Sequence, residues 1–390
     1  MNDVPKNNNL NKLQVALVYD KVNTFGGAER VLFALHTLFP QAPLYTSVYH
    51  SKTAQWASIF PQIIPSFLQN FPFASNHIQL YTAFMPIAFE SFNFDQYHLV
   101  ITVTSGEAKS IITKPNTLHL CYLLTPTRYL WPDPGYQSYR FNILNHPIHL
   151  IKAPFLHYLK IWDFAAAQRP DYIATISKNS QSRIQKYYQG NSIVIFPPVN
   201  ADFFKPKTNP RLPIANNYFL LVSRLASYKK VDLAIQTFNH LKYKLIIAGT
   251  GPEFNRLKSL AKPNITLLGH TSEKQLLELY QNCQALIMPQ EEDFGLVALE
   301  AQACGKPVIA FNRGGATETI INHKTGIFFN YQSTTSLLAA LNKFAKHKFK
   351  AKDCRQQALK FSLDNFQTQI KQWINIQWQT HQAIEKTFRN

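Results

Sequence analysis

The chain has 390 residues, of which 46% are hydrophobic and 16% are charged, and its formal net charge is +18. This length and apolar content predict a globular protein of two domains, each with its own core, and exclude a disordered chain. The four cysteines stand singly in apolar runs without a C-x-x-C pair, which excludes a disulfide framework and a zinc site and indicates buried thiols in a reducing compartment.

The polar start MNDVPKNNNLNKLQ lacks the apolar core of a signal peptide, and no apolar run approaches the roughly 20 residues that span a bilayer. We therefore expect a cytoplasmic protein whose membrane contact, if it has one, is peripheral and at the inner face. The positive charge favours anionic partners, namely phosphorylated small molecules or anionic lipid. No nucleic-acid module is present, so nucleic acid is not an expected partner.

Alternating strand and helix signals in the first half predict a parallel sheet covered by helices. The strands are expected at 13–19, 99–103, 118–123, 172–176 and 192–196. A helix opens at Gly26-Gly27 and reaches about Phe39, and another covers 179–188. Two apolar stretches lie between these elements, 59–94 and 141–162, and Pro147 and Pro154 are expected to break the second. The second also carries Lys152 and Lys160, so either a membrane interface or packing on the first domain explains both stretches.

A linker is expected from Pro197 to Pro213. The second half then predicts strands at 218–222, 243–248, 265–268, 285–288 and 307–310, and helices at 229–239, 252–260 and 273–281. The lysine run 343–352 is interpreted as a solvated face or loop. A C-terminal helix begins at about Leu363. The expected domains are 1–199, on the acceptor side, and 200–365, which binds the nucleotide sugar, with 366–390 as a helix that packs back on the first domain.

The segment EEDFGLVALEAQACGKPVIA, from Glu291 to Ala310, reads as an acidic loop, a glycine, an apolar helix and a buried strand. A helix N-terminus binds phosphate through its unpaired N–H groups, and Gly295 lets an anion approach closely. Glu300 lies about 7 to 8 Å along the helix, at about 1.5 Å per residue, which suits a carboxylate that binds ribose hydroxyls. Glu292 lies ahead of the helix, where it would bind hydroxyls of the group that the phosphate carries. These features predict a nucleotide-sugar site.

Glu292, Glu300 and the following Gly314-Gly315 resemble the donor signature of family 4 retaining glycosyltransferases. The resemblance implies an α/β protein of GT-B fold, with two Rossmann-like domains facing each other across a cleft and a C-terminal helix that crosses back. It implies Arg224 and Lys229 as catalytic cations beside Glu292, because both positions of the family's strand-end turn match. Lys230 stands where the family usually has glycine.

The Gly249-Thr250-Gly251-Pro252 turn fails the dinucleotide fingerprint at Phe254 and resembles the family's Gly-x-Gly-Pro turn. The donor-binding residues implied by the resemblance are Gly27, Gly249, Gly251, Phe294, Gly295, Leu296, Val297 and Glu300. On the acceptor side it points to Gly26, Lys109, Thr125 and Arg128. Leu124 replaces a histidine that many members carry before the Thr-Pro step.

The block from Glu90 to Trp131 is similar to bacterial mannosyltransferases that assemble O-antigen or other surface polysaccharide. We therefore expect transfer of a hexose, mannose from GDP-mannose first, onto a glycan or lipid-linked acceptor with retention of configuration. A UDP-sugar donor, a nucleotide-sugar-binding protein without catalysis and a dinucleotide-dependent oxidoreductase are the alternatives. No cofactor or metal is expected, because no Asp-x-Asp pair follows a strand and Arg224 and Lys229 supply positive charge.

Overall fold

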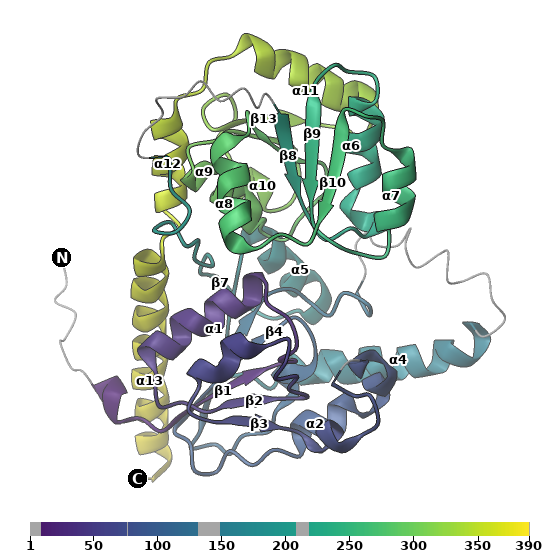
Figure 1. Cartoon of the computed structure of the whole chain (residues 1–390). Helices are drawn as coiled ribbons and strands as arrows, with labels where there is room; N and C mark the ends of the chain where they lie inside the picture. Colours follow the sequence, from purple (N-terminus) through teal and green to yellow (C-terminus); the bar gives the residue numbers. More distant parts are fainter. Residues whose placement is uncertain (1–8, 76, 132–148, 208–217, 390) are drawn as a thin grey trace. The chain divides into compact units, whose positions relative to one another are not determined.

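The computed structural model describes residues 9–75, 77–131, 149–207 and 218–389. The chain divides into two compact units, which are described separately below. Within the described residues, unit 1 contains the ranges up to 131, from 149 to 197 and from 366 onward, and unit 2 contains those from 198 to 365. Each unit is built on one parallel sheet, as Figure 1 shows.

The sheet of unit 1 has the strand order β3-β2-β1-β4-β5-β6-β7, and every neighbouring pair is parallel. Its strands are β1 (Val15–Tyr19), β2 (Leu44–Thr46), β3 (Ile63–Pro65), β4 (Leu99–Thr104), β5 (Leu118–Leu123), β6 (Tyr172–Thr175) and β7 (Ile193–Val194). The five strands expected from the sequence are all present, although β7 is shorter than predicted. The sequence analysis missed β2 and β3, which have three residues each.

The α-helices of unit 1 are α1 (Gly27–Leu38), α2 (Met85–Glu90), α4 (His149–Ala166), α5 (Lys178–Tyr188) and α13 (Leu363–Arg389), the last counted from Phe366. Short 3-10 helices are η1 (Asn9–Lys12), η2 (Gln55–Ile59), η3 (Phe67–Asn70), η4 (Ile78–Phe84) and η5 (Glu107–Ser110). The predicted break at Pro154 is wrong, because α4 continues through this residue. Burial of Leu159, Asp163 and Ala166 holds this part of α4 against the unit. Pro147 lies outside the described residues.

The apolar stretch 59–94 contributes to the core and also to the surface. Leu68, Ile78, Met85 and Phe89 belong to a buried cluster on one face of the sheet. Other large apolar side chains of the same stretch are exposed, namely those of Ile59, Phe67, Phe73, Leu80, Phe84 and Ile87. Packing on the core therefore accounts for only part of the stretch.

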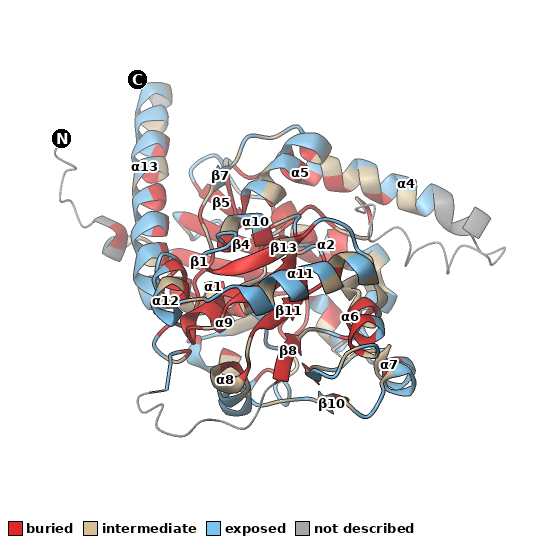
Figure 2. Ribbon diagram, turned by 90° about the horizontal axis from the view of Figure 1, so that it is seen from above, coloured by how far each residue is buried: buried red, intermediate tan, exposed pale blue. Residues whose placement is uncertain are grey.

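Helix α13 lies along unit 1 with one apolar face. Its buried residues recur at helical spacing: Phe366, Ile370, Trp373, Ile374 and Trp378. The Phe366 ring lies 5.8 Å from that of Tyr122, and the Trp378 ring lies 6.4 Å from that of His98. In Figure 2 the red, buried side of α13 alternates with its pale blue, exposed side along the helix.

The sheet of unit 2 has the order β10-β9-β8-β11-β12-β13 and is also parallel. Its strands are β8 (Tyr218–Val222), β9 (Lys244–Ala248), β10 (Ile265–Gly269), β11 (Leu286–Met288), β12 (Val308–Phe311) and β13 (Gly326–Phe329). Its helices are η6 (Ser227–Lys229), α6 (Val231–Phe238), α7 (Phe254–Leu260), α8 (Glu273–Asn282), α9 (Leu296–Ala303), α10 (Ala316–Thr319), α11 (Thr334–Lys346) and α12 (Ala351–Leu359).

Helices cover both faces of this second sheet. One buried cluster joins the sheet to α6, α7 and α11, and the other joins it to α8, α9, α10 and α12. The lysines of the run 343–352 are all exposed, at the end of α11, at the start of α12 and between these helices, which confirms the expected solvated face. All four cysteines are buried thiols. None of the helices in the described part of the chain is long and apolar enough to span a membrane.

Candidate functional site

Two turns at the carboxyl ends of β8 and β9 pack directly on each other in unit 2. The Leu225 amide donates to the Thr250 carbonyl at 2.8 Å. A Cβ atom at Gly249 would lie 1.9 Å from the Ser223 carbonyl oxygen, and one at Gly251 would lie 2.2 Å from that of Leu225. Gly249 also has a φ of +141°, so both glycines are required by this close approach. The carboxyl edge of a parallel sheet is where open α/β folds bind ligands.

The β8 turn carries the two predicted cations. Arg224 is exposed, and Lys229 lies in η6 with its side chain 12% exposed. Lys230 has a φ of +51° and a ψ of 33°, the left-handed conformation that glycine adopts without steric cost. The local backbone at this position is therefore the shape that a glycine would favour, although the side chain is that of lysine.

Gly314 and Gly315 hold the acidic loop in place. The Gly315 amide donates to the Glu292 carbonyl at 2.8 Å, and Glu292 pairs with Gly314 as a parallel bridge. A Cβ at either glycine would lie 2.3 Å from a backbone atom of this loop, the Glu292 oxygen or the Phe294 Cα. Gly295 precedes α9 with a φ of +88°. These glycines allow the loop between β11 and α9 to lie against the β12 turn.

Lys229 and Glu292 bring the two motifs together. The Lys229 Nζ lies 2.5 Å from the Glu292 Oε1, which also accepts a hydrogen bond from the Gln290 Nε2 at 2.9 Å. The Glu292 side chain is 17% exposed. An ammonium and a carboxylate, 63 residues apart in sequence, therefore meet at one partly open position on the edge of the sheet.

Helix α9 begins beside this pair. Its first N–H groups have no partner within the helix, and the aligned peptide dipoles favour an anion there. Gly295, Leu296 and Val297 are partly exposed at this end. The Phe294 side chain is buried against the Phe361 ring, at 5.7 Å, so Phe294 can contribute to a ligand site only through its main chain.

Glu300 lies one turn further along α9 and is 4% exposed. Its Oε2 accepts a hydrogen bond from the Tyr280 Oη at 2.8 Å. Tyr280 was not predicted as part of the site. The tyrosine fixes one carboxylate oxygen of Glu300, which orients the other.

The predicted glycine loop of unit 1 lies after β1. Gly26 and Gly27 are exposed, and α1 begins at Gly27. Glu29 follows in the first turn of α1, where the helix dipole favours a carboxylate. It is buried and accepts a hydrogen bond from the Tyr19 Oη at 2.6 Å. Burial raises the pKa of the Glu29 carboxyl group.

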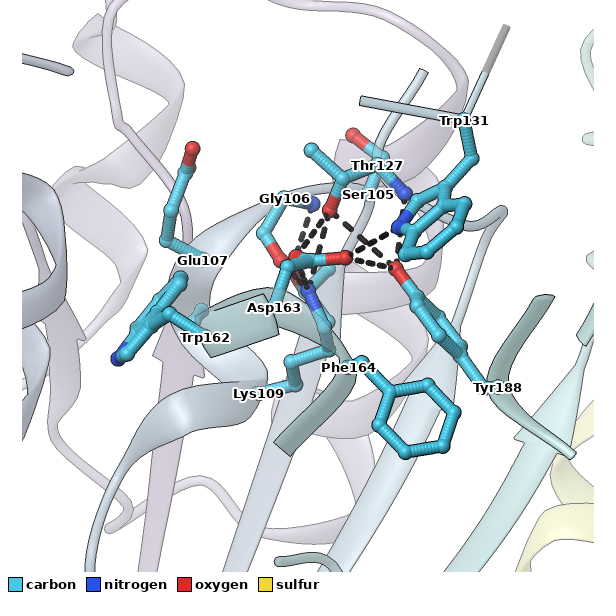
Figure 3. Close-up of polar contacts among 12 residues, drawn as sticks. Ser105, Gly106, Glu107, Lys109, Thr127, Trp131, Trp162, Asp163, Phe164 and Tyr188 are labelled. Carbon is cyan, nitrogen blue, oxygen red and sulfur yellow. Dashed lines mark hydrogen bonds and ion pairs between the residues drawn. The ribbon is translucent and has the colours of Figure 1, made fainter. Parts of the chain in front are cut away.

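Lys109 lies inside unit 1. Figure 3 shows that its side chain and those of Thr127, Trp131 and Tyr188 all point toward Asp163. Its Nζ lies 2.5 Å from the Asp163 Oδ1, and the two side chains are 1% and 0% exposed. Asp163 also accepts hydrogen bonds at 2.7 Å from Thr127, Trp131 and Tyr188. The expectation that Lys109 contacts an acceptor has no support here, because its charge is enclosed and paired.

The remaining predicted acceptor-side residues surround the loop after β5. Thr125 is buried, and its Oγ1 accepts a hydrogen bond from the Arg183 Nη1 at 2.7 Å. Leu124, in the place of the family histidine, donates its amide to the Thr104 carbonyl at 2.8 Å. Arg128 is partly exposed. The first contact joins the loop after β5 to α5, and the second joins it to the end of β4.

Glu107, which follows β4, was not predicted as a site residue. It is buried, and its Oε1 accepts a hydrogen bond from the Tyr129 Oη at 2.6 Å. Burial, followed by the nearby Asp20, raises the pKa of the Glu107 carboxyl group to about 7. The position after a predicted strand could have signalled it, but its partner is 22 residues away. Among the described residues, no group of three or more His, Cys, Asp and Glu side chains could hold a metal ion.

The sequence comparisons agree with the geometry of unit 2. Residues 204–361 match the family model described as glycosyl transferases group 1. A GDP-mannose-dependent alpha-(1-6)-phosphatidylinositol monomannoside mannosyltransferase from Mycobacterium tuberculosis is 28% identical over 198 residues, which cover 44% of this chain and 51% of that protein. The chain spans about half the length of the curated relatives it matches.

Solved structures resemble nearly the whole chain. Sucrose-phosphate synthase from Thermosynechococcus elongatus superimposes with a TM-score of 0.70 at 17% identity, covering 94% of this chain and 100% of that one. HepE from Anabaena, solved in complex with UDP and glucose, superimposes with a TM-score of 0.67 at 18% identity, covering 93% and 99%. At these identities the likeness shows the fold, which is GT-B. The comparisons thus show that residues 204–361 resemble group 1 glycosyl transferases and that the chain has the GT-B fold.

Proposed function

We propose that this chain is a group 1 glycosyltransferase, which transfers a hexose from a nucleotide sugar to a hydroxyl group of a glycan or lipid-linked acceptor with retention of configuration. The observation that carries the proposal is the meeting of Lys229, Glu292 and the start of α9 at one edge of unit 2. A cation, a carboxylate and a helix N-terminus together match a diphosphate joined to a hydroxylated sugar.

Different residues of unit 2 would bind different parts of the donor. The main-chain N–H groups from Gly295 to Val297, together with Arg224 and Lys229, would bind the diphosphate and stabilise the negative charge that grows on it as the sugar leaves. Glu292 would accept hydrogen bonds from the sugar, and Glu300 from the ribose. In the structure Lys229 and Glu292 bind each other, so the donor would replace this contact with phosphate on the ammonium and hydroxyls on the carboxylate.

The leaving phosphate is the base that we propose for the acceptor proton. A phosphate oxygen on the departing face of the sugar would accept the proton, and the new bond would form on that same face, which retains the configuration. No metal takes part in this proposal, because Arg224 and Lys229 supply the charge that a metal would otherwise supply.

We propose mannose from GDP-mannose as the donor and surface polysaccharide, including lipopolysaccharide, as the product. The M. tuberculosis relative, whose name specifies GDP-mannose, supports this choice over part of the chain. A UDP-sugar is the second candidate, and the HepE structure, which was solved with UDP and glucose, supports it.

A peripheral contact with an anionic membrane, at the inner face in the cytoplasm, completes the proposal. Residues 53–89 contain no Asp, Glu, Lys or Arg, and Phe73, Leu80 and Ile87 are exposed within them. Helix α4 adds exposed Tyr158 and Ile161, and its Trp162 Nε1 donates to Glu90 at the end of α2, which places both segments side by side. Such an apolar surface suits a lipid interface.

The donor test combines binding with turnover. A panel of GDP- and UDP-sugars is screened for stabilisation of the chain against heat, and the best ligand is then assayed for product. Lys229→Ala and Glu292→Ala are each expected to lower kcat at least about 100-fold, the scale of losing one transition-state contact. Glu291→Ala is the matched control, because it removes a neighbouring exposed carboxylate.

The outcomes separate the candidate functions. Near-normal turnover in Lys229→Ala or Glu292→Ala would contradict the proposed site. Binding of a nucleotide sugar without product from any acceptor would favour a binding protein without catalysis. Stabilisation by NADH and not by any nucleotide sugar would favour an oxidoreductase.

A further inference from the structure

Glu107 occupies the edge of unit 1 where a ligand of a parallel sheet is expected. It begins η5, three residues after the end of β4, and parallel sheets bind ligands beyond the carboxyl ends of their strands. The side chain is 7% exposed. Figure 3 shows it extending away from the contacts between Lys109 and Asp163. The carboxylate is therefore separate from the buried ion pair, although it lies two residues from Lys109.

The two carboxylate oxygens of Glu107 differ in their hydrogen-bond partners. Oε1 accepts the hydrogen bond from the Tyr129 Oη at 2.6 Å, whereas Oε2 has no hydrogen-bond donor among the described residues. In Asp20, which follows β1, both carboxylate oxygens accept hydrogen bonds. Its Oδ1 accepts from Thr104 and from the Ala108 amide, and its Oδ2 accepts from the Ser105 amide.

The Glu107 side chain is 7% exposed, and enclosing a carboxylate to this extent is costly, because burial removes most of the water that would otherwise donate to it. The raised pKa of Glu107, about 7, expresses the same cost. The hydrogen bond from Tyr129 does not by itself require a charged group at position 107, because the amide oxygen of a glutamine would accept the same hydrogen bond. The geometry therefore points to a ligand donor for Oε2.

We propose that the Glu107 Oε2 accepts a hydrogen bond from a hydroxyl group of the acceptor glycan and so positions that acceptor in unit 1. The inference rests on the proposed glycosyl transfer and adds the acceptor contact that the proposal lacked. A hydroxyl group fits because it donates without carrying charge. A phosphate or a carboxylate would be repelled by Glu107 and by the neighbouring Asp20.

The wall of this acceptor site is held by the buried ion pair. Glu107 and Lys109 share η5, and Tyr129 follows Thr127 in the loop after β5. The Lys109 Nζ and the Asp163 Oδ1 both contact the Thr127 Oγ1, at 3.1 and 2.7 Å. The η5 turn and the loop after β5 are thus joined twice, by the Lys109 contacts and by the hydrogen bond between Glu107 and Tyr129. Lys109 acts here as a positioning residue.

Glu107→Gln is the decisive variant. Its amide oxygen can keep the Tyr129 contact, while its NH₂ group replaces the acceptor oxygen with donors. The acceptor probe is whichever of octyl α-mannoside, octyl β-glucoside and octyl β-galactoside the wild-type chain uses best. We expect the KM for this probe to rise at least tenfold in Glu107→Gln, with less than a twofold change in the KM for the donor.

Two further variants separate acceptor binding from a structural role. Asp95→Asn alters another carboxylate of unit 1, which is exposed and pairs with Lys114, and should leave the acceptor KM unchanged. Tyr129→Phe removes the hydrogen bond to the Glu107 Oε1 and keeps Oε2, so its effect on the acceptor KM should be smaller than that of Glu107→Gln. A larger effect of Tyr129→Phe would mean that only the hydrogen bond between Tyr129 and Glu107 matters, which overturns the proposal.

The pH dependence of kcat/KM for the acceptor distinguishes acceptor binding by Glu107 from a purely structural role of this residue. The groups that face Glu107 are Asp20, Lys109, Tyr129 and Asp163. Wild-type kcat/KM for the acceptor should rise between pH 6 and pH 8 as the carboxyl group ionises, and Glu107→Gln should lose this rise. An unchanged acceptor KM and pH profile in Glu107→Gln would refute the inference.

Failure of the broader proposal looks different. If the wild-type chain makes no product with any donor and any of the three probes, the proposed function fails, whatever Glu107 does. Should Glu107→Gln not fold, Glu107→Asp carries the test, because it keeps the charge and withdraws it by one methylene. A raised acceptor KM with the pH rise retained supports the contact, and an unchanged KM overturns it.

Discussion

Replacing Asp163 and Lys109 in turn should destabilise unit 1 unequally. Both side chains are enclosed, so removal of either partner leaves a charge buried without its counter-ion, which costs about 3–5 kcal/mol where no other group stabilises that charge. The surroundings of the two charges differ, however. Asp163 has three neutral donors besides Lys109, whereas the other partners of the Lys109 ammonium are the Gly106 carbonyl and the Thr127 hydroxyl.

The asymmetry sets the expected magnitudes. In Lys109→Met the Asp163 carboxylate keeps its hydrogen bonds from Thr127, Trp131 and Tyr188, and we expect a loss of about 2–3 kcal/mol. In Asp163→Asn the ammonium loses its counter-ion, and the new NH₂ group faces donors in place of an acceptor. We expect a loss of about 4–5 kcal/mol, the upper part of the range for a broken buried pair. The double variant should cost less than the sum of the two.

Tryptophan fluorescence during urea unfolding is a selective assay for this effect. All five tryptophans, at positions 56, 131, 162, 373 and 378, belong to unit 1. The signal therefore reports unit 1 even where unit 2 unfolds separately, and Trp131 itself donates to Asp163. A loss below about 1 kcal/mol in Asp163→Asn, or a greater loss in Lys109→Met than in Asp163→Asn, would refute the reasoning.

Four other outcomes follow from local geometry. The free energy of unfolding of Lys230→Gly, measured by thermal denaturation, should be about 1 kcal/mol higher than that of Lys230→Ala, because glycine adopts a φ of +51° without steric strain. Gly249→Ala should cost unit 2 about 3 kcal/mol or more by far-UV circular dichroism, since its Cβ would meet the Ser223 oxygen at 1.9 Å. A chelator should leave turnover unchanged, and strong inhibition would restore a metal to the mechanism. The folded-state pKa of Glu107, about 7, is raised, so its contribution to stability is present below about pH 4.5 and is lost as the pH rises through 7. Glu107→Gln should therefore gain about 3 kcal/mol over the wild-type chain at pH 8, at about 1.4 kcal/mol per pKa unit, and much less at pH 5, as measured by urea unfolding.

The long strands could be predicted because each is a run of mainly apolar and β-branched residues. β5 and β8 occupy the expected residues, and β1 and β4 differ by a residue or two at their ends. Strands β2 and β3 were missed because three residues give no periodic pattern, and prolines flank or end them. Helix α4 continues through Pro154, and burial of Leu159, Asp163 and Ala166 holds the part of the helix that follows, a tertiary effect that local sequence does not carry.

The site in unit 2 could be predicted because its parts are consecutive residues. Gly249 and Gly251 flank one turn, and Glu292, Gly295 and Glu300 fall within nine residues, so the backbone itself encodes the geometry. The contact between Lys229 and Glu292 confirms that the two motifs meet, which spacing alone could not give. The GT-B fold expected from the resemblance is confirmed by the two parallel sheets and the solved structures.

The site in unit 1 could not be predicted in the same way, since it consists of side chains that folding gathers from distant segments. Asp163 lies 54 residues from Lys109, and Tyr129 lies 22 from Glu107. The resemblance therefore pointed to Lys109 as an acceptor-side candidate, whereas in the structure its ammonium is enclosed and contacts Asp163 and Thr127.

This difference in construction bears on where the specificity of the proposed enzyme lies. The family model matches residues 204–361, within the unit whose glycines and helix terminus form the candidate donor site. Binding of a diphosphate needs backbone geometry, which tolerates little change, because a Cβ at Gly249, Gly251 or Gly315 would overlap main-chain atoms. An acceptor, by contrast, is distinguished by hydroxyl positions, which single side chains such as Glu107 can recognise. The choice of acceptor should therefore be altered by substitutions around Glu107 and Tyr129 while donor binding is unchanged, and a variant there that changes the preferred nucleotide would contradict this division between the units.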